Sequence, residues 1–222
     1  MTIEPMWSPS TAIDPQEIKR LIGKSNPTIL DIGCNDGAHT QLFFELFEFA
    51  HVSSFEPDWR AQDRFRNTTA LTCPRARLFP VALGATDGTT EFYPSEGDGV
   101  LQPKIWDYSG SIRKPKMHLR RHPWCKFGPA TTVPVMRLDS WARAWGITHV
   151  DFIWADVQGA EGDLIWGGTD TLARTRYFFT EYSDEEMYEQ QPTLEHLLKL
   201  LPTFRIVHLY PEDVLLRNEA LP

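Results

Sequence analysis

The chain has 222 residues, of which 41% are hydrophobic, so it is long and apolar enough to form one folded domain with a full core. Its formal net charge of −8 argues against general binding to nucleic acid or to anionic membranes. Three cysteines without a CxxC pair argue against a disulfide framework and a structural zinc site. Because neither a signal peptide nor a membrane span is evident, we expect residues 1–222 to form a single cytoplasmic domain.

Strands and helices are expected to alternate along most of the chain. The first helix is expected after Asp14, a suitable N-cap that is followed by Pro15. Further helices are expected after Gly37 and over residues 58–69, 138–145, 160–166 and 193–201. Strands are expected over residues 28–32, 51–55, 77–83, 90–93, 131–136, 149–155, 177–182, 204–209 and 214–216. This alternation predicts an α/β, Rossmann-like fold, with a mostly parallel central sheet, helices on both faces and an antiparallel closing strand.

Residues 94–130 interrupt this alternation with no sustained hydrophobic period. A long irregular segment inside a compact domain is usually functional, so we expect an insertion that forms a lid over the active site. Its rings, Trp106, Tyr108 and Trp124, are suited to stacking on sugars. Its basic residues are Lys104, Arg113, Lys114, Lys116, Arg120, Arg121 and Lys126, with Asp107 as the sole acid between the first and the last. Two interpretations remain, a solvated basic loop and a lid that recruits an anionic acceptor.

The turn after the first expected strand carries the main functional motif. Residues 29–40 read ILDIGCNDGAHT and join that strand to a helix, which is where ligands bind in doubly wound sheets. Gly33 and Gly37 let the backbone approach a ligand closely, and the helix N-terminus offers free N–H groups. A dinucleotide fold would have GxGxxG, but Asn35 stands at its middle glycine, and no GKS or GKT follows for a P-loop. The arrangement D-x-G-x-x-x-G, which begins at Asp31, is instead typical of methyltransferases.

A second acid, Glu56, ends the next expected strand, 19 residues after Gly37. A carboxylate at this place can accept hydrogen bonds from two ribose hydroxyls. Asp31 would then hold the methionine ammonium group, directly or through water, while Glu56 holds the ribose. Together the two acids and the glycine loop predict that the chain binds S-adenosylmethionine.

A later block makes the resemblance more specific. Residues 150–161, VDFIWADVQGAE, resemble the fourth-strand signature of the FkbM family of methyltransferases, which is usually close to IDxxKIDVEGxE. Two residues depart from that pattern, since Ala155 replaces the usual Lys and Gln158 the usual Glu. Other blocks similar to the family are residues 31–40, 55–57, 81–84, 109–112 and 135–139. The resemblance implies the class I methyltransferase fold and O-methylation of a hydroxyl on a sugar, a glycolipid or a polyketide-like metabolite.

The motifs and the resemblance together name the expected site residues. Those expected to bind the cofactor are Asp31, Gly33, Cys34, Asn35, Gly37, Thr40, Glu56, Pro57, Ala82, Leu83, Ser111, Asp156 and Val157. Asp156 ends the fourth strand of the alternation and is a candidate for orienting the cofactor or the acceptor, while Glu181 ends the fifth and is a candidate base or acceptor ligand. Glu161 is a third catalytic candidate, although a carboxylate in the first turn of a helix also stabilises the helix.

Several alternatives stay open. Mg²⁺ is compatible with Asp156, Glu161 and Glu181, but their spacing does not require it, and no metal ligand is assigned. An NAD-dependent oxidoreductase shares the fold class and the ribose-binding acid. A non-catalytic module that binds S-adenosylmethionine is the other rival, because Ala155 and Gln158 depart from the family pattern. The expected partner is a small-molecule or glycan acceptor, and no nucleic acid is expected.

Overall fold

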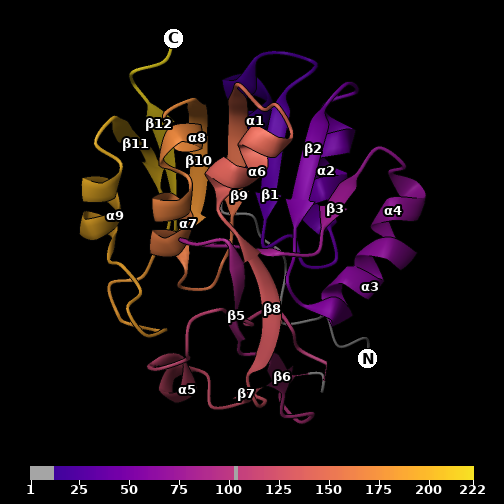
Figure 1. The fold of residues 1–222 in the computed structure, drawn as a ribbon, viewed down its shortest axis with the longest axis vertical. Coiled ribbons are helices and arrows are strands. Elements are labelled where there is room, and N and C mark those ends of the chain that lie inside the picture. The colour runs from indigo at the N-terminus through magenta and orange to yellow at the C-terminus, as the bar shows by residue number, and fades with distance from the viewer. Residues whose placement is uncertain (1–12, 103–104) are drawn as a thin grey trace.

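The computed structural model describes residues 13–102 and 105–222, and a seven-stranded sheet forms its centre (Figure 1). The strand order is β11-β12-β10-β9-β1-β2-β3, and β12 runs antiparallel to both of its neighbours while the other pairs are parallel. The strands are β1 (Thr28–Ile32), β2 (His51–Phe55), β3 (Arg77–Phe79), β9 (Val150–Ala155), β10 (Thr175–Glu181), β11 (Phe204–Leu209) and β12 (Asp213–Asn218). The expected parallel sheet with an antiparallel closing strand is therefore confirmed.

Helices cover both faces of this sheet because alternate strand residues on each face are apolar. On one face, α1 (Pro15–Ile22) and α2 (Ala38–Leu46) pack against a core that includes Ile29 and Phe152. On the other face, α6 (Leu138–Ala144), α7 (Glu161–Gly167), α8 (Thr169–Leu172) and α9 (Leu194–Leu200) contribute to a core with Leu30 and Ile153. Two further helices, α3 (Trp59–Asn67) and α4 (Thr69–Thr72), follow β2.

The prediction of one continuous strand over residues 77–83 is wrong. It divides into β3, in the central sheet, and β4 (Ala82–Leu83), which belongs to a second sheet of order β4-β8-β5. Pro80 has no N–H to donate to a strand neighbour, and Val81 N donates to Phe79 O at 2.9 Å, which turns the chain at this point. The other two strands are β5 (Gly88–Phe92) and β8 (Thr131–Met136). The turn thus directs the chain out of the central sheet and into this smaller one.

The segment 94–130 is more ordered than its sequence pattern indicates. It contains β6 (Ser95–Gly97) paired with β7 (Cys125–Phe127), and a short helix, α5 (His118–Arg121). Ser95 stabilises its interior, because its buried hydroxyl donates to Trp106 O at 2.8 Å and accepts from Ser109 N at 3.1 Å. Together with β5 and β8, the segment forms a lower layer at the carboxyl ends of the parallel strands (Figure 1). Lys104 lies outside the described residues.

Among the helices of the described residues, none combines the length and the apolar character that crossing a membrane requires.

Gly33 brings the ends of β1, β2 and β9 together. It has a φ of +80°, and its N–H donates to Phe55 O at 2.9 Å, while Asp156 N donates to Ile32 O at 2.9 Å. A Cβ at Gly33 would lie 1.8 Å from Asp156 O. Only glycine combines this left-handed conformation with so close a backbone approach.

We predict that Gly33→Ala lowers the free energy of unfolding by about 3 kcal/mol or more, because it adds a steric clash with backbone to the cost of a left-handed alanine. Gly146→Ala is the matched control, since Gly146 has a φ of +66° and a Cβ added there would meet no described atom within 4 Å. That control should cost only about 1–2 kcal/mol. Urea unfolding of both variants measures the difference, and equal losses would contradict the close approach.

Candidate active site

Nine of the expected cofactor residues line one cavity at the carboxyl ends of β1, β2, β4 and β9. They are Gly33, Asn35, Glu56, Pro57, Ala82, Leu83, Ser111, Asp156 and Val157. The chain segments that hold them are far apart in sequence, and the strand order of the two sheets brings them to a common edge. The cavity therefore lies at the site expected for a ligand of a doubly wound sheet.

The other four expected residues, Asp31, Cys34, Gly37 and Thr40, are outside the cavity wall and support it from behind. Asp31 is fully buried and accepts a hydrogen bond from Thr40 Oγ1 at 2.5 Å. Burial raises the pKa of Asp31 to about 7. Its Oδ1 has no hydrogen-bond partner among the described residues. A buried carboxylate oxygen without a partner is costly, so a bridging water is the partner that this atom calls for.

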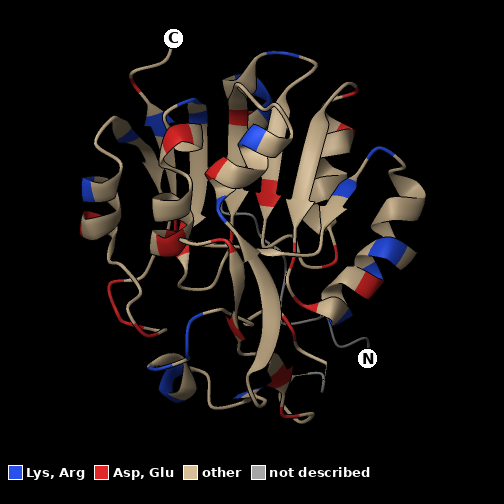
Figure 2. Cartoon of the chain, in the orientation of Figure 1, with Lys and Arg blue, Asp and Glu red and all other residues tan. Residues whose placement is uncertain are grey.

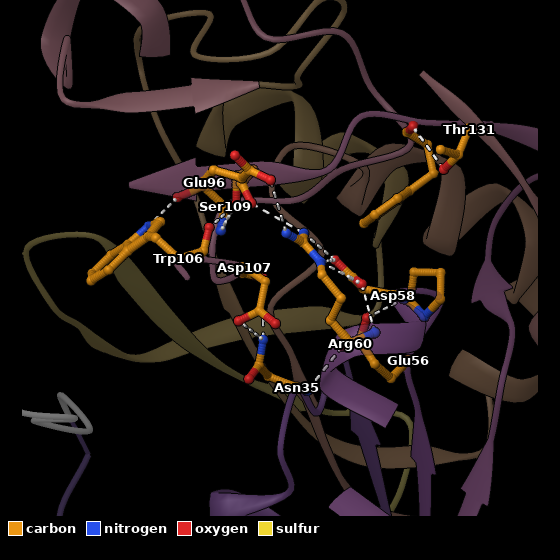
Figure 3. A network of polar contacts seen from close by, with 12 residues as sticks. Asn35, Glu56, Asp58, Arg60, Glu96, Trp106, Asp107, Ser109 and Thr131 are labelled. Carbon is orange, nitrogen blue, oxygen red and sulfur yellow. Dashed lines mark hydrogen bonds and ion pairs between the residues drawn. The ribbon is translucent and has the colours of Figure 1, made fainter. Parts of the chain in front are cut away.

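Glu56 connects the glycine loop to the second strand. Its carboxylate accepts from Asn35 N at 2.9 Å and from Asp58 N at 2.7 Å (Figure 3). Burial raises its pKa to about 8, although both backbone bonds favour the charged form. A carboxylate has about four acceptor positions, so two remain for hydroxyl groups of a ligand in the cavity.

Two residues that no local sequence pattern marks as part of the site, Arg64 and Asp107, are joined at its edge. The Arg64 guanidinium donates to both oxygens of Asp107 at 2.7 Å, and to Asn35 Oδ1 at 2.9 Å. Asn35 Nδ2 in turn donates to Asp107 O at 3.2 Å. These contacts fasten the segment 94–130 to the glycine loop, at the wall of the cavity. The only sequence signal was that Asp107 is a single acid in a basic stretch.

Two of the catalytic candidates, Asp156 and Glu181, lie on either side of Gln158. The Gln158 side-chain nitrogen donates to Asp156 Oδ1 at 2.6 Å and to Glu181 Oε2 at 2.9 Å. Burial raises the pKa of both carboxyl groups, and the charge of Asp156 raises that of Glu181 further, to well above its usual range. Such a pair favours a shared proton over two negative charges.

Glu161, the third catalytic candidate, lies in the first turn of α7. It does not line the cavity that holds the expected cofactor residues, nor a second hollow that is lined by Glu181. Its side chain is 1% exposed, and its Oε1 accepts from Gly159 N at 3.2 Å. Burial raises its pKa to about 7. Its burial and this hydrogen bond favour a structural role for Glu161 in the first turn of α7 over a catalytic one.

A second, wider hollow of about 760 Å³ adjoins the first cavity. Gln158 lines both, while Asp156 lines only the first and Glu181 only the second. Trp106 and Trp124 contribute rings to the wall, with their centroids 4.9 Å apart in an edge-to-face contact. The hollow thus offers aromatic surface and the half-buried carboxyl group of Glu181 in one place, which suits a polar ring with apolar faces.

The basic residues of the segment 94–130 are mostly paired. Arg113 donates to both oxygens of Asp163 at 2.5 Å, and Lys116 and Arg121 form ion pairs with Glu186 and Glu185. Figure 2 shows the blue of α5 at the lower left, beneath the acidic loop that precedes α9. Because these charges balance each other, the structure does not favour a lid that recruits an anionic acceptor.

The described residues contain no group of three or more Asp, Glu, His or Cys side chains that is arranged to hold a metal ion.

Comparisons with known proteins agree with this geometry. The profile described as "Methyltransferase FkbM domain" matches residues 31–207. The 2-O-methyltransferase NoeI of Sinorhizobium fredii (strain NBRC 101917 / NGR234) is 47% identical over 210 residues, which cover 93% of this chain and 85% of that protein.

Two solved structures share the fold at low sequence identity. The methyltransferase FkbM from Methylobacillus flagellatus KT has a TM-score of 0.55 and 12% identity, and the match covers 87% of this chain. This chain spans less than half of that structure, since the match covers 44% of it. An rRNA methylase from Streptococcus thermophilus has a TM-score of 0.50 and 10% identity, and the match covers 97% of this chain and 99% of that one.

The profile covers most of the chain, and the identity to a curated methyltransferase is high over nearly its full length. The expected resemblance is thereby confirmed, and the rival assignment to NAD-dependent oxidoreductases is not supported. The chain belongs to the FkbM family of S-adenosylmethionine-dependent methyltransferases.

Proposed function

We propose that this methyltransferase transfers the methyl group of S-adenosylmethionine to a hydroxyl oxygen of a sugar-containing acceptor, such as a glycan or a glycolipid. The observation that carries the proposal is the position of the Asp156 and Glu181 carboxyl groups, of which the first lines the cavity with the expected cofactor residues and the second lines the aromatic hollow. The 47% identical relative is named a 2-O-methyltransferase, which supports oxygen as the atom that is methylated. A polyketide-like acceptor is the second candidate.

The residues of the first cavity fit S-adenosylmethionine. The unpartnered Oδ1 of Asp31 and the glycine loop suit the amino-acid part, and Glu56 suits the ribose hydroxyls. Pro57, Ala82, Leu83, Ser111 and Val157 complete the wall around the rest of the molecule. When bound, S-adenosylmethionine supplies an electrophilic methyl group on a positively charged sulfur. The chain itself therefore has to hold the acceptor hydroxyl in line with that group and remove its proton.

The pair of Asp156 and Glu181 is the candidate base. At a pH where the pair holds one proton, it retains one negative charge and can accept the proton of an acceptor hydroxyl. An ordinary carboxylate is a weak base, so the raised pKa values of this half-buried pair improve the match to neutral pH. Glu181 faces the second hollow, so it is the member that we place against the acceptor.

The second hollow is the candidate acceptor site. Trp124, with the buried Trp106 packed edge-to-face against it, provides apolar ring surface for a sugar, and acidic side chains provide hydrogen-bond acceptors for its hydroxyls. Its acidic residues, Glu181, Glu185 and Glu212, outnumber its one basic residue, Arg121, which is already paired with Glu185. We therefore expect an uncharged acceptor. We also propose that residues 94–130 are a lid within one domain, because they supply walls to both cavities.

The proposed reaction is tested by measuring the release of S-adenosylhomocysteine with a panel of acceptors. Methyl glycosides of common hexoses and 6-deoxyhexoses, their sulfated counterparts and phenolic polyketides form a suitable panel. Turnover with neutral glycosides supports the proposal. Turnover with phenols alone favours the second candidate, and binding of S-adenosylmethionine without turnover of any hydroxyl acceptor contradicts the proposed reaction.

We predict that Glu56→Gln weakens S-adenosylmethionine binding by about 10-fold or more, because an amide accepts fewer and weaker hydrogen bonds from hydroxyls than a carboxylate does. Titration calorimetry measures the Kd. Glu48→Gln is the control, since Glu48 is exposed and lies outside both cavities. An unchanged Kd in Glu56→Gln would remove the ribose contact from the proposed site.

We predict that Glu181→Gln lowers kcat by about 100-fold or more, because it removes a carboxylate that accepts the hydroxyl proton. The Kd for S-adenosylmethionine should change less than threefold, since Glu181 does not line the first cavity. Steady-state kinetics at saturating S-adenosylmethionine, combined with calorimetry, separates the two effects. If kcat is retained, the base must be another group.

A further inference from the structure

Gln158 occupies an unusual backbone position. It lies in the turn between β9 and α7 with a φ of +51°, and Gly159 follows with a φ of +89°. A non-glycine residue rarely adopts this left-handed conformation, and it persists only where its surroundings hold it. Here Ser111 Oγ donates to Gln158 O at 2.7 Å, which links the turn to the segment 94–130. The conformation of this turn thus fixes the direction in which the Gln158 side chain leaves the backbone.

The side-chain amide of Gln158 has a single favourable orientation. Its nitrogen donates to Asp156 Oδ1 at 2.6 Å and to Glu181 Oε2 at 2.9 Å, so each of its two N–H bonds meets a carboxyl group. Its oxygen lies 2.9 Å from the Tyr188 hydroxyl, which is also 2.9 Å from Ser109 O and can donate to one of the two oxygens at a time. The reverse orientation would place the amide oxygen against both carboxyl groups, of which at most one, the protonated member of the pair, could donate to it. The amide is therefore fixed in polarity as well as in position.

The same side chain separates the two cavities. Gln158 lines both of them, whereas Asp156 lines only the first and Glu181 only the second. The amide thus spans from the cofactor side to the acceptor side. The titratable groups around the Gln158 amide are Asp156, Glu161, Glu181, Tyr188, Glu212 and Asp213, with Cys125 and His118 beside Tyr188.

We propose that Gln158 is a positioning residue for methyl transfer, whose amide fixes the carboxyl groups of Asp156 and Glu181 relative to each other across the wall between the cavities. The inference rests on the proposed function, in which this pair is the base. A glutamate at this position has the same length, but when ionised it cannot donate and it adds a third negative charge to the pair. An uncharged donor is the side chain that can hold two carboxyl groups together without opposing the charge on either.

Two variants test this role. Gln158→Gly removes the amide without forcing a Cβ into the left-handed conformation, and Gln158→Glu keeps the length of the side chain but not its donor. Gln190→Gly and Gln190→Glu are matched controls, because Gln190 also has a left-handed φ, of +62°, but is exposed and outside both cavities. The readouts are kcat, acceptor KM, the pH profile of kcat/KM with an acceptor found in the panel, and the Kd for S-adenosylmethionine.

We expect Gln158→Gly to lower kcat at saturating S-adenosylmethionine about 10-fold or more, because misplacement of a catalytic group is costly. Both Gln158 variants should move the acidic limb of the profile to higher pH, since donation from the amide favours the charged carboxylates. The shift should be larger in Gln158→Glu, which adds a negative neighbour. An acidic limb that stays in place in both variants would overturn the inference, as would an unchanged kcat.

A second measurement keeps the inference separate from the proposed reaction. In protein with ¹³C-labelled glutamate, the carboxyl signal of Glu181 is assigned by its loss in Glu181→Gln, and its titration is followed by NMR. Its apparent pKa should rise in both Gln158 variants and stay the same in the Gln190 controls. If the wild type binds S-adenosylmethionine but turns over no hydroxyl acceptor, the proposed function fails. If the Glu181 titration does not move, the inference about Gln158 fails whatever the turnover.

Discussion

The close backbone approach of Gly33 to Asp156 is the constraint on which the site depends. Gly33 N and Cys34 N both donate to Phe55 O, and Asp156 N donates to Ile32 O, so the ends of β1, β2 and β9 are tied by backbone bonds alone. Glu56 follows Phe55 directly, so these bonds also fix where its carboxylate lies. A Cβ at Gly33 would collide with Asp156 O. The positions of Glu56 and Asp156 therefore both depend on glycine at position 33.

Burial of carboxyl groups is the second physical feature of this site. Burial raises the pKa of Asp31 to about 7 and that of Glu56 to about 8, so near neutral pH the folded protein holds protons that the unfolded chain would release. The fold gives up stability there, since charging these groups in a low-dielectric interior is costly. A positively charged ligand favours the ionised carboxylates and offsets that cost. The acids that destabilise the fold on their own are thus suited to binding a sulfonium compound.

The sequence predicts the features that depend on neighbouring residues, and it misses those that depend on distant partners. The glycine loop and Glu56 follow from the spacing of a strand end, a turn and a helix start, and the structure places Gly33 and Glu56 in one cavity. The apolar run over residues 77–83 looks continuous, although Pro80 divides it between two sheets. The bond between Arg64 and Asp107 joins residues 43 positions apart, and no local pattern indicates it.

The pairing of the charges in the segment 94–130 also depends on distant partners. In the sequence, its basic residues and the acidic stretch near Glu185 are two separate features, whereas in the structure Arg121 and Glu185 neutralise each other. Ion pairs as exposed as this one contribute little stability individually. The half-buried pair of Arg113 and Asp163, with two bonds at 2.5 Å, holds the segment more firmly near Gln158. Its cations therefore hold together the walls of the second hollow, and in the proposed function the shape and rings of that hollow would select the acceptor.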